Sequence, residues 1–228
     1  MSRLISLNGR DWLFKDFYGE DWRWRSSHLP DTRDRRHWRI GSVPGCPHYD
    51  LWKLGEIPDP YVDCNSLLSE WISQRTWLYK KTFNVSEEIK GKRVYLHFEG
   101  VDYQAEFFLN GESLGKHTGM FTPVVLDVSD KLFYDTENLL AVVIEPAPLE
   151  EPQVGRTSRV KTVKTRMNYW WDFCPRMVHL GIWDDVYLEI SGSVCLQDVF
   201  VCPKLEPDYQ RADVTVAVEL DSAGQTLA

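Results

Sequence analysis

The sequence predicts an all-β protein, an antiparallel β-sandwich of the jelly-roll type. Short runs that alternate between apolar and polar side chains recur along the chain, and an Asn-Gly pair joins two of them. Helical periodicity is nearly absent, and the one convincing helix is expected over about residues 66–73, where Leu67 and Trp71 lie one turn apart. Many short strands with so little helix are typical of a sandwich.

The individual strands follow from the alternation. Between residues 76 and 85, Trp77 and Tyr79 alternate with polar side chains, which predicts a half-buried strand. Asn110-Gly111 predicts a tight hairpin turn, because both central residues of a type I′ turn need a positive φ. The same reasoning predicts further strands at 92–99, 103–109, 122–128, 138–145, 183–190 and 196–202.

Two segments lack this alternation of apolar and polar residues, and a separate alternating pattern begins near the end of the chain. Residues 19–39 are crowded with charge and Trp, which indicates a loop with a returning strand, and residues 146–175 form a connection too long to be idle. Residues 196–202 and 212–220 alternate like two strands of another sandwich. We therefore expect a first domain over residues 1–192 and the start of an incomplete second β-sandwich over 193–228, in a truncated chain.

Composition excludes several classes of protein. The 228 residues include ten each of Trp, Tyr and Phe, far more than a disordered chain carries. The longest aliphatic run, residues 139–144, is too short to cross a bilayer, so no membrane partner is expected. A net charge of −8 and a pI of about 5.3 argue against a nucleic-acid partner.

Cysteine usage and the N-terminus predict a cytoplasmic protein without a metal. The first ten residues lack the apolar stretch of a signal peptide. The five cysteines are odd in number and form no CxxC pair, which favours reduced thiols. The six histidines show no metal-binding spacing, so neither a metal nor another cofactor is expected.

No catalytic residue is expected in this chain. The segment from Gly111 to Gly115 matches G-x-S-x-G, but it lies inside the expected hairpin and no helix follows it, so an ordinary turn is the better interpretation. Retaining glycosidic hydrolysis needs two carboxyl groups about 5 Å apart, and no pattern in the sequence identifies such a pair.

The long connection nevertheless carries two features that a ligand site could use. One is a basic cluster, which is either a solvated loop or the border of a polar site whose charges anchor the loop or pair with carboxylates. Its members are Arg156, Arg159, Lys161, Lys164 and Arg166.

The second feature is the run Asn168-Tyr-Trp-Trp-Asp-Phe-Cys-Pro175. It is either a plug of core aromatics with a capping aspartate or a carbohydrate subsite. Sugar rings stack their C–H faces on indoles, and their hydroxyls bind carboxylates, so Trp171 beside Asp172 offers both contacts. Adjacent residues diverge in a strand, so this interpretation requires a turn, which Pro175 makes plausible.

Several motifs occur in order along the chain: residues 43–61, Trp71-Ile72, residues 77–79, 98–105 and 109–111, Met120-Phe121, the Trp-Asp pair and residues 181–183. Together these motifs resemble family 2 glycoside hydrolases, especially β-mannosidases. The resemblance covers about residues 5–192 and implies an N-terminal jelly-roll, galactose-binding-like domain that binds sugar. It also implies that the tail from Ser193 opens an immunoglobulin-like sandwich, and that a TIM barrel with two catalytic glutamates follows, which is absent here.

The resemblance also implies roles for the aromatic run. In β-mannosidase-like enzymes the Trp-Asp motif contacts the terminal sugar in the barrel's active site, and Trp171 and Asp172 match it. Beside this match, we expect Trp170, Arg166 and Lys164 as supporting residues of the site. The commoner form is similar to Gly-Trp-Asp-Trp-Gly-Pro. Here Trp170, Phe173 and Cys174 stand in place of Gly, Trp and Gly.

Three hypotheses follow. In the first, the chain is the N-terminal domain of a retaining β-mannosidase-like exo-glycosidase and is inactive alone; β-galactosidase, β-glucuronidase and exo-β-glucosaminidase are sibling activities. In the second, it is a free-standing carbohydrate-binding module. In the third, it is a structural domain that packs on its own barrel and supports homo-oligomers.

Overall fold

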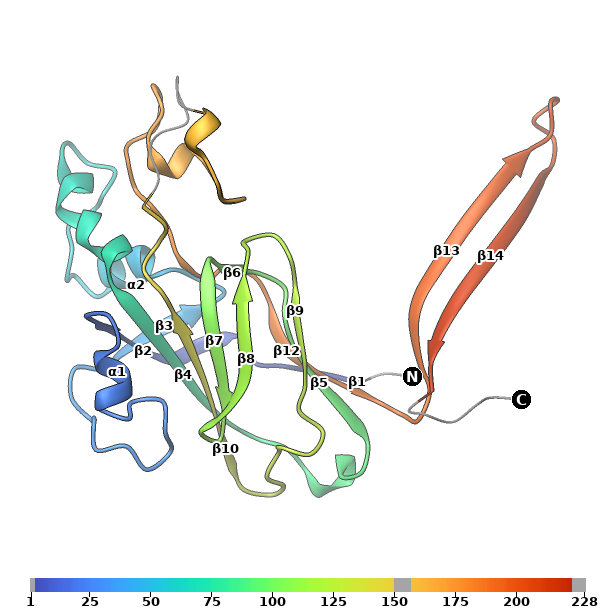
Figure 1. The fold of residues 1–228 in the computed structure, drawn as a ribbon, viewed down its shortest axis with the longest axis horizontal. Helices are drawn as coiled ribbons and strands as arrows, with labels where there is room; N and C mark the ends of the chain where they lie inside the picture. Colours follow the sequence, from blue (N-terminus) through green and yellow to red (C-terminus); the bar gives the residue numbers. More distant parts are fainter. Residues whose placement is uncertain (1–2, 150–156, 223–228) are drawn as a thin grey trace.

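Two antiparallel sheets pack face to face in the computed structural model, which describes residues 3–149 and 157–222 (Figure 1). The larger sheet has the order β3-β2-β4-β10-β7-β8 and the smaller has β1-β12-β5-β9. This arrangement confirms the predicted all-β sandwich. The strands of the larger sheet are β3 (Arg39–Val43), β2 (Gly9–Phe17), β4 (Thr76–Asn84), β10 (Glu137–Ile144), β7 (Gln104–Leu109) and β8 (Glu112–Thr118). Those of the smaller sheet are β1 (Arg3–Ser6), β12 (Val186–Ser191), β5 (Arg93–Phe98) and β9 (Val124–Asp127).

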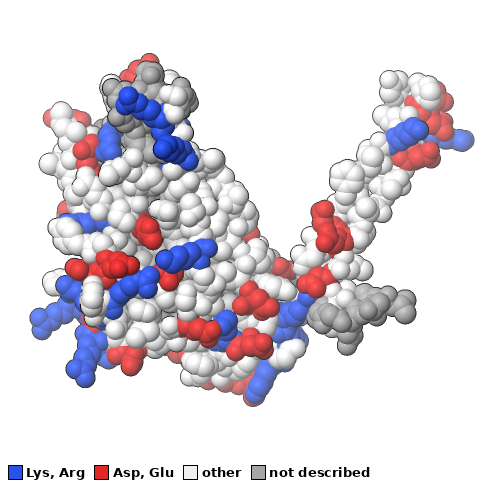
Figure 2. Space-filling model, in the orientation of Figure 1, with Lys and Arg blue, Asp and Glu red and all other residues white. Residues whose placement is uncertain are grey.

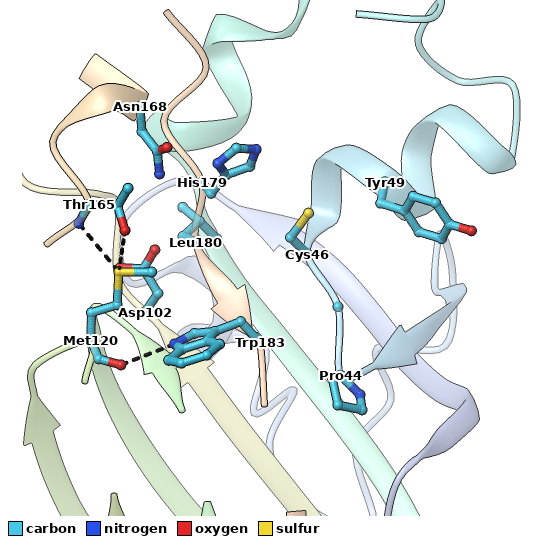
Figure 3. Close-up of a pocket in the computed structure, with 11 residues that line it drawn as sticks. Pro44, Cys46, Tyr49, Asp102, Met120, Thr165, Asn168, His179, Leu180 and Trp183 are labelled. Carbon is cyan, nitrogen blue, oxygen red and sulfur yellow. Dashed lines mark hydrogen bonds between the residues drawn. The ribbon is translucent and has the colours of Figure 1, made fainter. Parts of the chain in front are cut away.

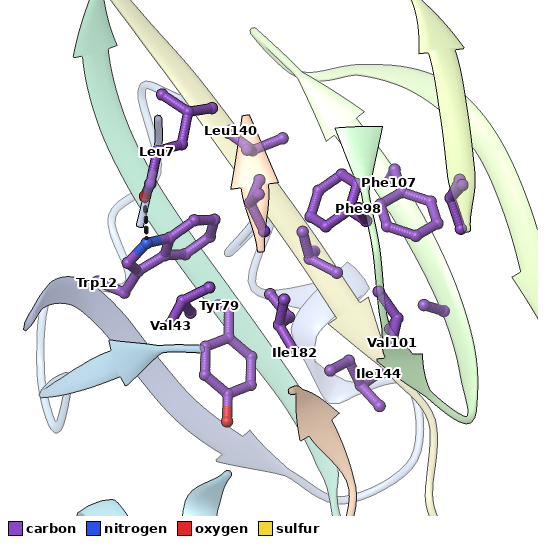
Figure 4. Packing of buried hydrophobic residues seen from close by; sticks show 14 of the residues in the cluster. Leu7, Trp12, Val43, Tyr79, Phe98, Val101, Phe107, Leu140, Ile144 and Ile182 are labelled. Carbon is purple, nitrogen blue, oxygen red and sulfur yellow. Dashed lines mark hydrogen bonds between the residues drawn. The ribbon is translucent and has the colours of Figure 1, made fainter. Parts of the chain in front are cut away.

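The core lies between the two sheets and is rich in aromatic side chains. Trp12 and Tyr79 from the larger sheet are fully buried, as is Phe98 from the smaller one (Figure 4). The Trp12 indole donates a hydrogen bond of 2.9 Å to the carbonyl oxygen of Leu7, so its one polar atom is satisfied inside the core. Within the described residues, none of the helices could cross a membrane.

One predicted strand is buried differently from the expectation. The first six residues of β4, 76–81, are buried on both faces, so it is not the half-buried strand that its alternation predicts. The Trp-rich segment 19–39 covers the outer face through α1 (Asp21–Trp24), and Trp22 and Trp38 pack with Leu78 in a second apolar cluster. This covering segment is far from β4 in sequence, so local periodicity carries no sign of it.

The helices also differ from the expectation. Residues 66–73 do form a helix, but it is the 3₁₀ helix η1 (Asn65–Gln74), and α1 and α2 (Pro47–Lys53) are additional short helices. Strands β1 and β2 are likewise additional to the predicted ones. The strand predicted for 183–190 begins only at β12, because β11 (Gly181–Ile182) pairs separately with β6 (Val101–Asp102).

The predicted hairpin is present between β7 and β8. Asn110 and Gly111 have φ of 54° and 88°, the positive values that this turn requires. Ser113 lies within β8, paired with Phe108, so the G-x-S-x-G segment is part of a hairpin and not a strand-to-helix elbow.

The tail forms an antiparallel hairpin of β13 (Cys195–Leu205) and β14 (Ala212–Asp221), as its alternation predicts. The hairpin extends away from the sandwich (Figure 1), and an ion pair of 2.5 Å joins Asp221 to Arg93 at its base. Both faces of the hairpin are exposed, with Val199 and Val216 among the exposed apolar side chains. A two-stranded ribbon of this kind needs further strands for stability, and the division into domains at 193 remains a prediction.

The charges are mixed over the surface. On the face shown in Figure 2, basic and acidic side chains are interspersed over the sandwich, while the tail hairpin carries several acidic groups. Such a mixture gives this face no single sign of charge.

Candidate functional site

Residues 164–179, which we call the Trp-Asp loop, stand at one end of the sandwich, drawn in orange at the top of Figure 1. The loop folds back on itself like an irregular hairpin. At its base the Lys164 ammonium donates a hydrogen bond of 2.6 Å to the carbonyl oxygen of His179, and in its middle the Met177 amide donates one of 2.9 Å to the carbonyl of Asn168. These links hold the outgoing and returning halves together, although the loop has little regular secondary structure.

The tip of the loop is a tight turn. Trp171 and Cys174 exchange both main-chain hydrogen bonds, each of 3.3 Å, so Asp172 and Phe173 form the apex. Asp172 is exposed and Trp171 is half-buried, with its ring centroid 6.5 Å from that of Phe173. The turn that a carbohydrate subsite requires here is therefore present, and the exposed Asp172 directly follows Trp171 in it.

Trp170 enters this turn with an unusual backbone conformation. Its φ is 114°, a value that residues with a Cβ rarely adopt. This is the position at which the resemblance places a glycine, which reaches such φ without steric cost. Trp170 therefore adopts a backbone conformation that is typical of glycine, and the residue is 54% exposed beside the apex.

The two predicted basic residues lie at the base of the loop and not at its tip. The Lys164 side chain is completely buried and forms an ion pair with Asp102 of β6. The Arg166 guanidinium donates from Nε to the carbonyl oxygen of Lys164 over 2.8 Å and lies 5.0 Å from the ring centroid of Tyr169. The structure thus groups Trp170–Asp172 at the tip and separates Lys164 from them. Arg156 lies outside the described residues.

A cavity of about 530 Å³ opens beside the base of the Trp-Asp loop (Figure 3). Trp183 and Met120 form an apolar wall, and the Trp183 indole donates a hydrogen bond of 3.1 Å to the Met120 carbonyl oxygen. Trp171 and Asp172 are not part of its lining. The full lining is Pro44, Gly45, Cys46, Tyr49, Asp102, Met120, Thr165, Asn168, His179, Leu180 and Trp183.

The groups around the cavity are mostly uncharged. Burial lowers the pKa of His48 to about 3 and that of His179 to about 4, so both rings are neutral at pH 7. Burial raises the pKa of the Cys46 thiol, which makes it a poor nucleophile. In the parts of the chain that the structure describes, no group of three or more His, Cys, Asp or Glu could hold a metal ion.

Residues far apart in the sequence meet at this cavity, and that is why sequence patterns do not single them out as a site. Asp102, Met120 and the stretch from His179 to Trp183 come from three different segments. The available signal is indirect: residues 98–105, Met120 and residues 181–183 all fall in motifs that carry the family resemblance.

A family model described as glycosyl hydrolase 2 galactose-binding domain-like matches residues 22–184. The chain belongs to this family. It corresponds to the N-terminal galactose-binding-like domain of family 2 glycoside hydrolases, which confirms both the predicted fold and the resemblance.

Its relatives are much longer proteins. Beta-mannosidase B of Neosartorya fischeri is 28% identical over 214 residues, a match that covers 88% of this chain and 25% of that protein. The crystal structure of a beta-D-mannosidase from Dictyoglomus thermophilum superposes with a TM-score of 0.79 at 29% identity, covering 96% of this chain and 26% of that one. A beta-glucuronidase from an uncultured Clostridium species shares the fold, with a TM-score of 0.67 at 20% identity. The chain thus spans about a quarter of the length of the two mannosidases and about a third of the glucuronidase, of which it covers 35%.

Proposed function

We propose that this chain is the N-terminal domain of a β-mannosidase-like exo-glycosidase, which hydrolyses terminal β-linked sugars. The observation that carries the proposal is the tight turn at the tip of the Trp-Asp loop, where the exposed Asp172 directly follows the half-buried Trp171. A pyranose ring has an apolar C–H face and outward hydroxyls, so these two neighbours match both of its chemistries. The similarity to beta-mannosidases over most of the chain supports the same substrate class.

In this proposal, bond hydrolysis and binding of the terminal sugar are carried out by two different parts of one protein. Two carboxylates outside residues 1–228 perform retaining hydrolysis, one as nucleophile and one as acid and base. Asp172 accepts hydrogen bonds from hydroxyls of the non-reducing-end sugar, and Trp171 forms one wall of its pocket. The protein's partners are then a carbohydrate and its own catalytic barrel.

The test compares the complete protein, as its gene encodes it, with the 228-residue chain. Both are assayed with nitrophenyl β-mannoside, β-galactoside, β-glucuronide and β-glucosaminide. We expect the complete protein to prefer the β-mannoside and the 228-residue chain to hydrolyse none of them. If the complete protein hydrolyses only one of the other three glycosides, the proposed sugar is wrong and is replaced by that one. Turnover by the 228-residue chain contradicts the proposal that the catalytic carboxylates lie outside it.

One observation favours a second candidate, a carbohydrate-binding module. Phe173 is 75% exposed and Trp170 is 54% exposed in the same turn of the chain, and such surface aromatics are typical of sugar-binding platforms. A gene that ends at Ala228, together with sugar binding by the 228-residue chain, would favour this candidate. Light scattering of the complete protein tests the third candidate, in which the domain supports a homo-oligomer.

We also propose a cytoplasmic location. All five cysteines are free thiols, which suits a reducing compartment. Fractionation of the source cells tests this location, and recovery of the protein from the medium contradicts it.

A further inference from the structure

The Trp-Asp loop is fixed to the sandwich at its base by one buried ammonium group. Lys164 Nζ pairs with a carboxylate oxygen of Asp102 and also donates a hydrogen bond of 2.6 Å to the carbonyl oxygen of His179. Lys164 begins the loop and His179 ends it, so this one group joins both ends of the loop to each other and to Asp102.

Asp102 is a rigid point of attachment. It lies in β6, where its main chain pairs with Gly181 of β11, only two residues after His179. The Asp102 and Lys164 side chains are 2% and 0% exposed. A buried ion pair must be held in good geometry to offset its desolvation, so it tolerates little movement of either partner.

The links above the base carry this fixed position to the tip. The Asn168–Met177 hydrogen bond and the Trp171–Cys174 pair follow in order along the two halves of the loop. The Tyr169 hydroxyl donates a hydrogen bond of 2.8 Å to the carbonyl oxygen of Pro148, which ties the outgoing half to the chain after β10. The two halves are joined at separate points and not by a continuous ladder, and Tyr169 and Val178 pack in the core below the tip, so the position of the tip depends on how these lower contacts are held.

We propose that Lys164 is a positioning residue: its ammonium group, held by Asp102, sets the position of Trp171 and Asp172 without touching the sugar. The inference rests on the proposed function of Trp171 and Asp172 in binding the terminal sugar. Lys164 is therefore not expected to contact the sugar directly, because its completely buried side chain has no surface that a sugar could reach.

The first test measures the loop itself by hydrogen exchange in the complete protein. Lys164→Met alone leaves the Asp102 charge buried and unpaired, which can unfold the domain, so the informative variant is Lys164→Met with Asp102→Asn. We expect amides of residues 165–178 to exchange at least tenfold faster in this double variant, while amides of β4 and β10 keep their protection. Lys92→Met, at an exposed lysine outside the loop, is the control and leaves both regions unchanged.

The second test measures whether Lys164 acts through Asp172. With nitrophenyl β-mannoside, the double variant is expected to lose about 10- to 100-fold in kcat/KM, the size of effect that a small misplacement of a binding group produces. Adding Asp172→Ala to the double variant is then expected to cost less than a further threefold. Two effects that simply multiply would indicate independent roles.

The outcomes separate the two proposals. If hydrogen exchange in the loop is unchanged in the folded double variant, the positioning role of Lys164 is wrong. The role is also wrong if Asp172→Ala lowers kcat/KM as much in the double variant as in the wild type. If the complete protein hydrolyses none of the glycosides, the proposed function fails, and the exchange measurement alone then decides whether Lys164 fixes the loop.

Discussion

His48 and His179 lie edge to face beside the cavity, with ring centroids 5.3 Å apart. His48 lies in α2 and His179 ends the Trp-Asp loop, so this contact joins the helix to the loop. Protonation of either ring in the folded chain is unfavourable above about pH 4, because burial lowers the pKa of His48 to about 3 and that of His179 to about 4.

The first prediction is an acid-sensitive domain. The unfolded chain binds protons at histidine from about pH 6.5 downward, while the folded chain does so only near pH 3 to 4, so folding stability falls across this window. The expected loss at pH 4.5 is on the order of 2 kcal/mol per histidine. Denaturant unfolding at pH 7.5 and pH 4.5 measures it.

Variants isolate the histidine contribution, because burial also raises the pKa of Asp50 and Asp102, which acts in the opposite direction. His48→Leu should reduce the loss between the two pH values. His37→Asn is the matched control, since His37 is exposed at a φ of 63° that Asn tolerates. Equal pH dependence of the wild type and His48→Leu would rule this explanation out.

The second prediction concerns Asp172 in the complete protein. A charge-assisted hydrogen bond to a sugar hydroxyl is worth about 1.5–3 kcal/mol, so Asp172→Ala should lower kcat/KM by about 10- to 150-fold. Steady-state kinetics with a nitrophenyl glycoside measure this loss. Asp130→Ala, at an exposed aspartate outside the cavity, is the control, and a loss below threefold for Asp172→Ala removes the role given to Asp172.

The third prediction is that Trp170→Gly stabilises the chain. Non-glycine residues held at unfavourable φ cost about 1–3 kcal/mol, and glycine adopts the φ of 114° freely. Since Trp170 is more than half exposed, little packing is lost. We expect a rise in the free energy of unfolding relative to Trp170→Ala, which removes the indole but keeps the strain; equal values for the two variants would show that φ carries no cost.

The limits of sequence-based prediction are visible at particular residues. The turn at Asn110-Gly111 is predictable because the required φ values are properties of those two residues alone. The pair of Lys164 with Asp102 spans 62 positions, and its burial depends on how β6 packs against the loop. The sequence could indicate that the loop's basic residues anchor it or pair with carboxylates, but not which carboxylate or which part of the loop.

The last prediction concerns Gly100 and the wall of the cavity. A Cβ at Gly100 would overlap the Trp183 indole, whose Nε1 donates a hydrogen bond to the Met120 carbonyl oxygen. Gly100→Ala should therefore displace Trp183 and lower the free energy of unfolding by about 1–3 kcal/mol, as overpacking does. Denaturant unfolding and tryptophan fluorescence measure both effects. Gly192→Ala is the matched control, because a Cβ there meets no atom within 4 Å. If both variants behave alike, the space beside Gly100 does not hold Trp183 in place.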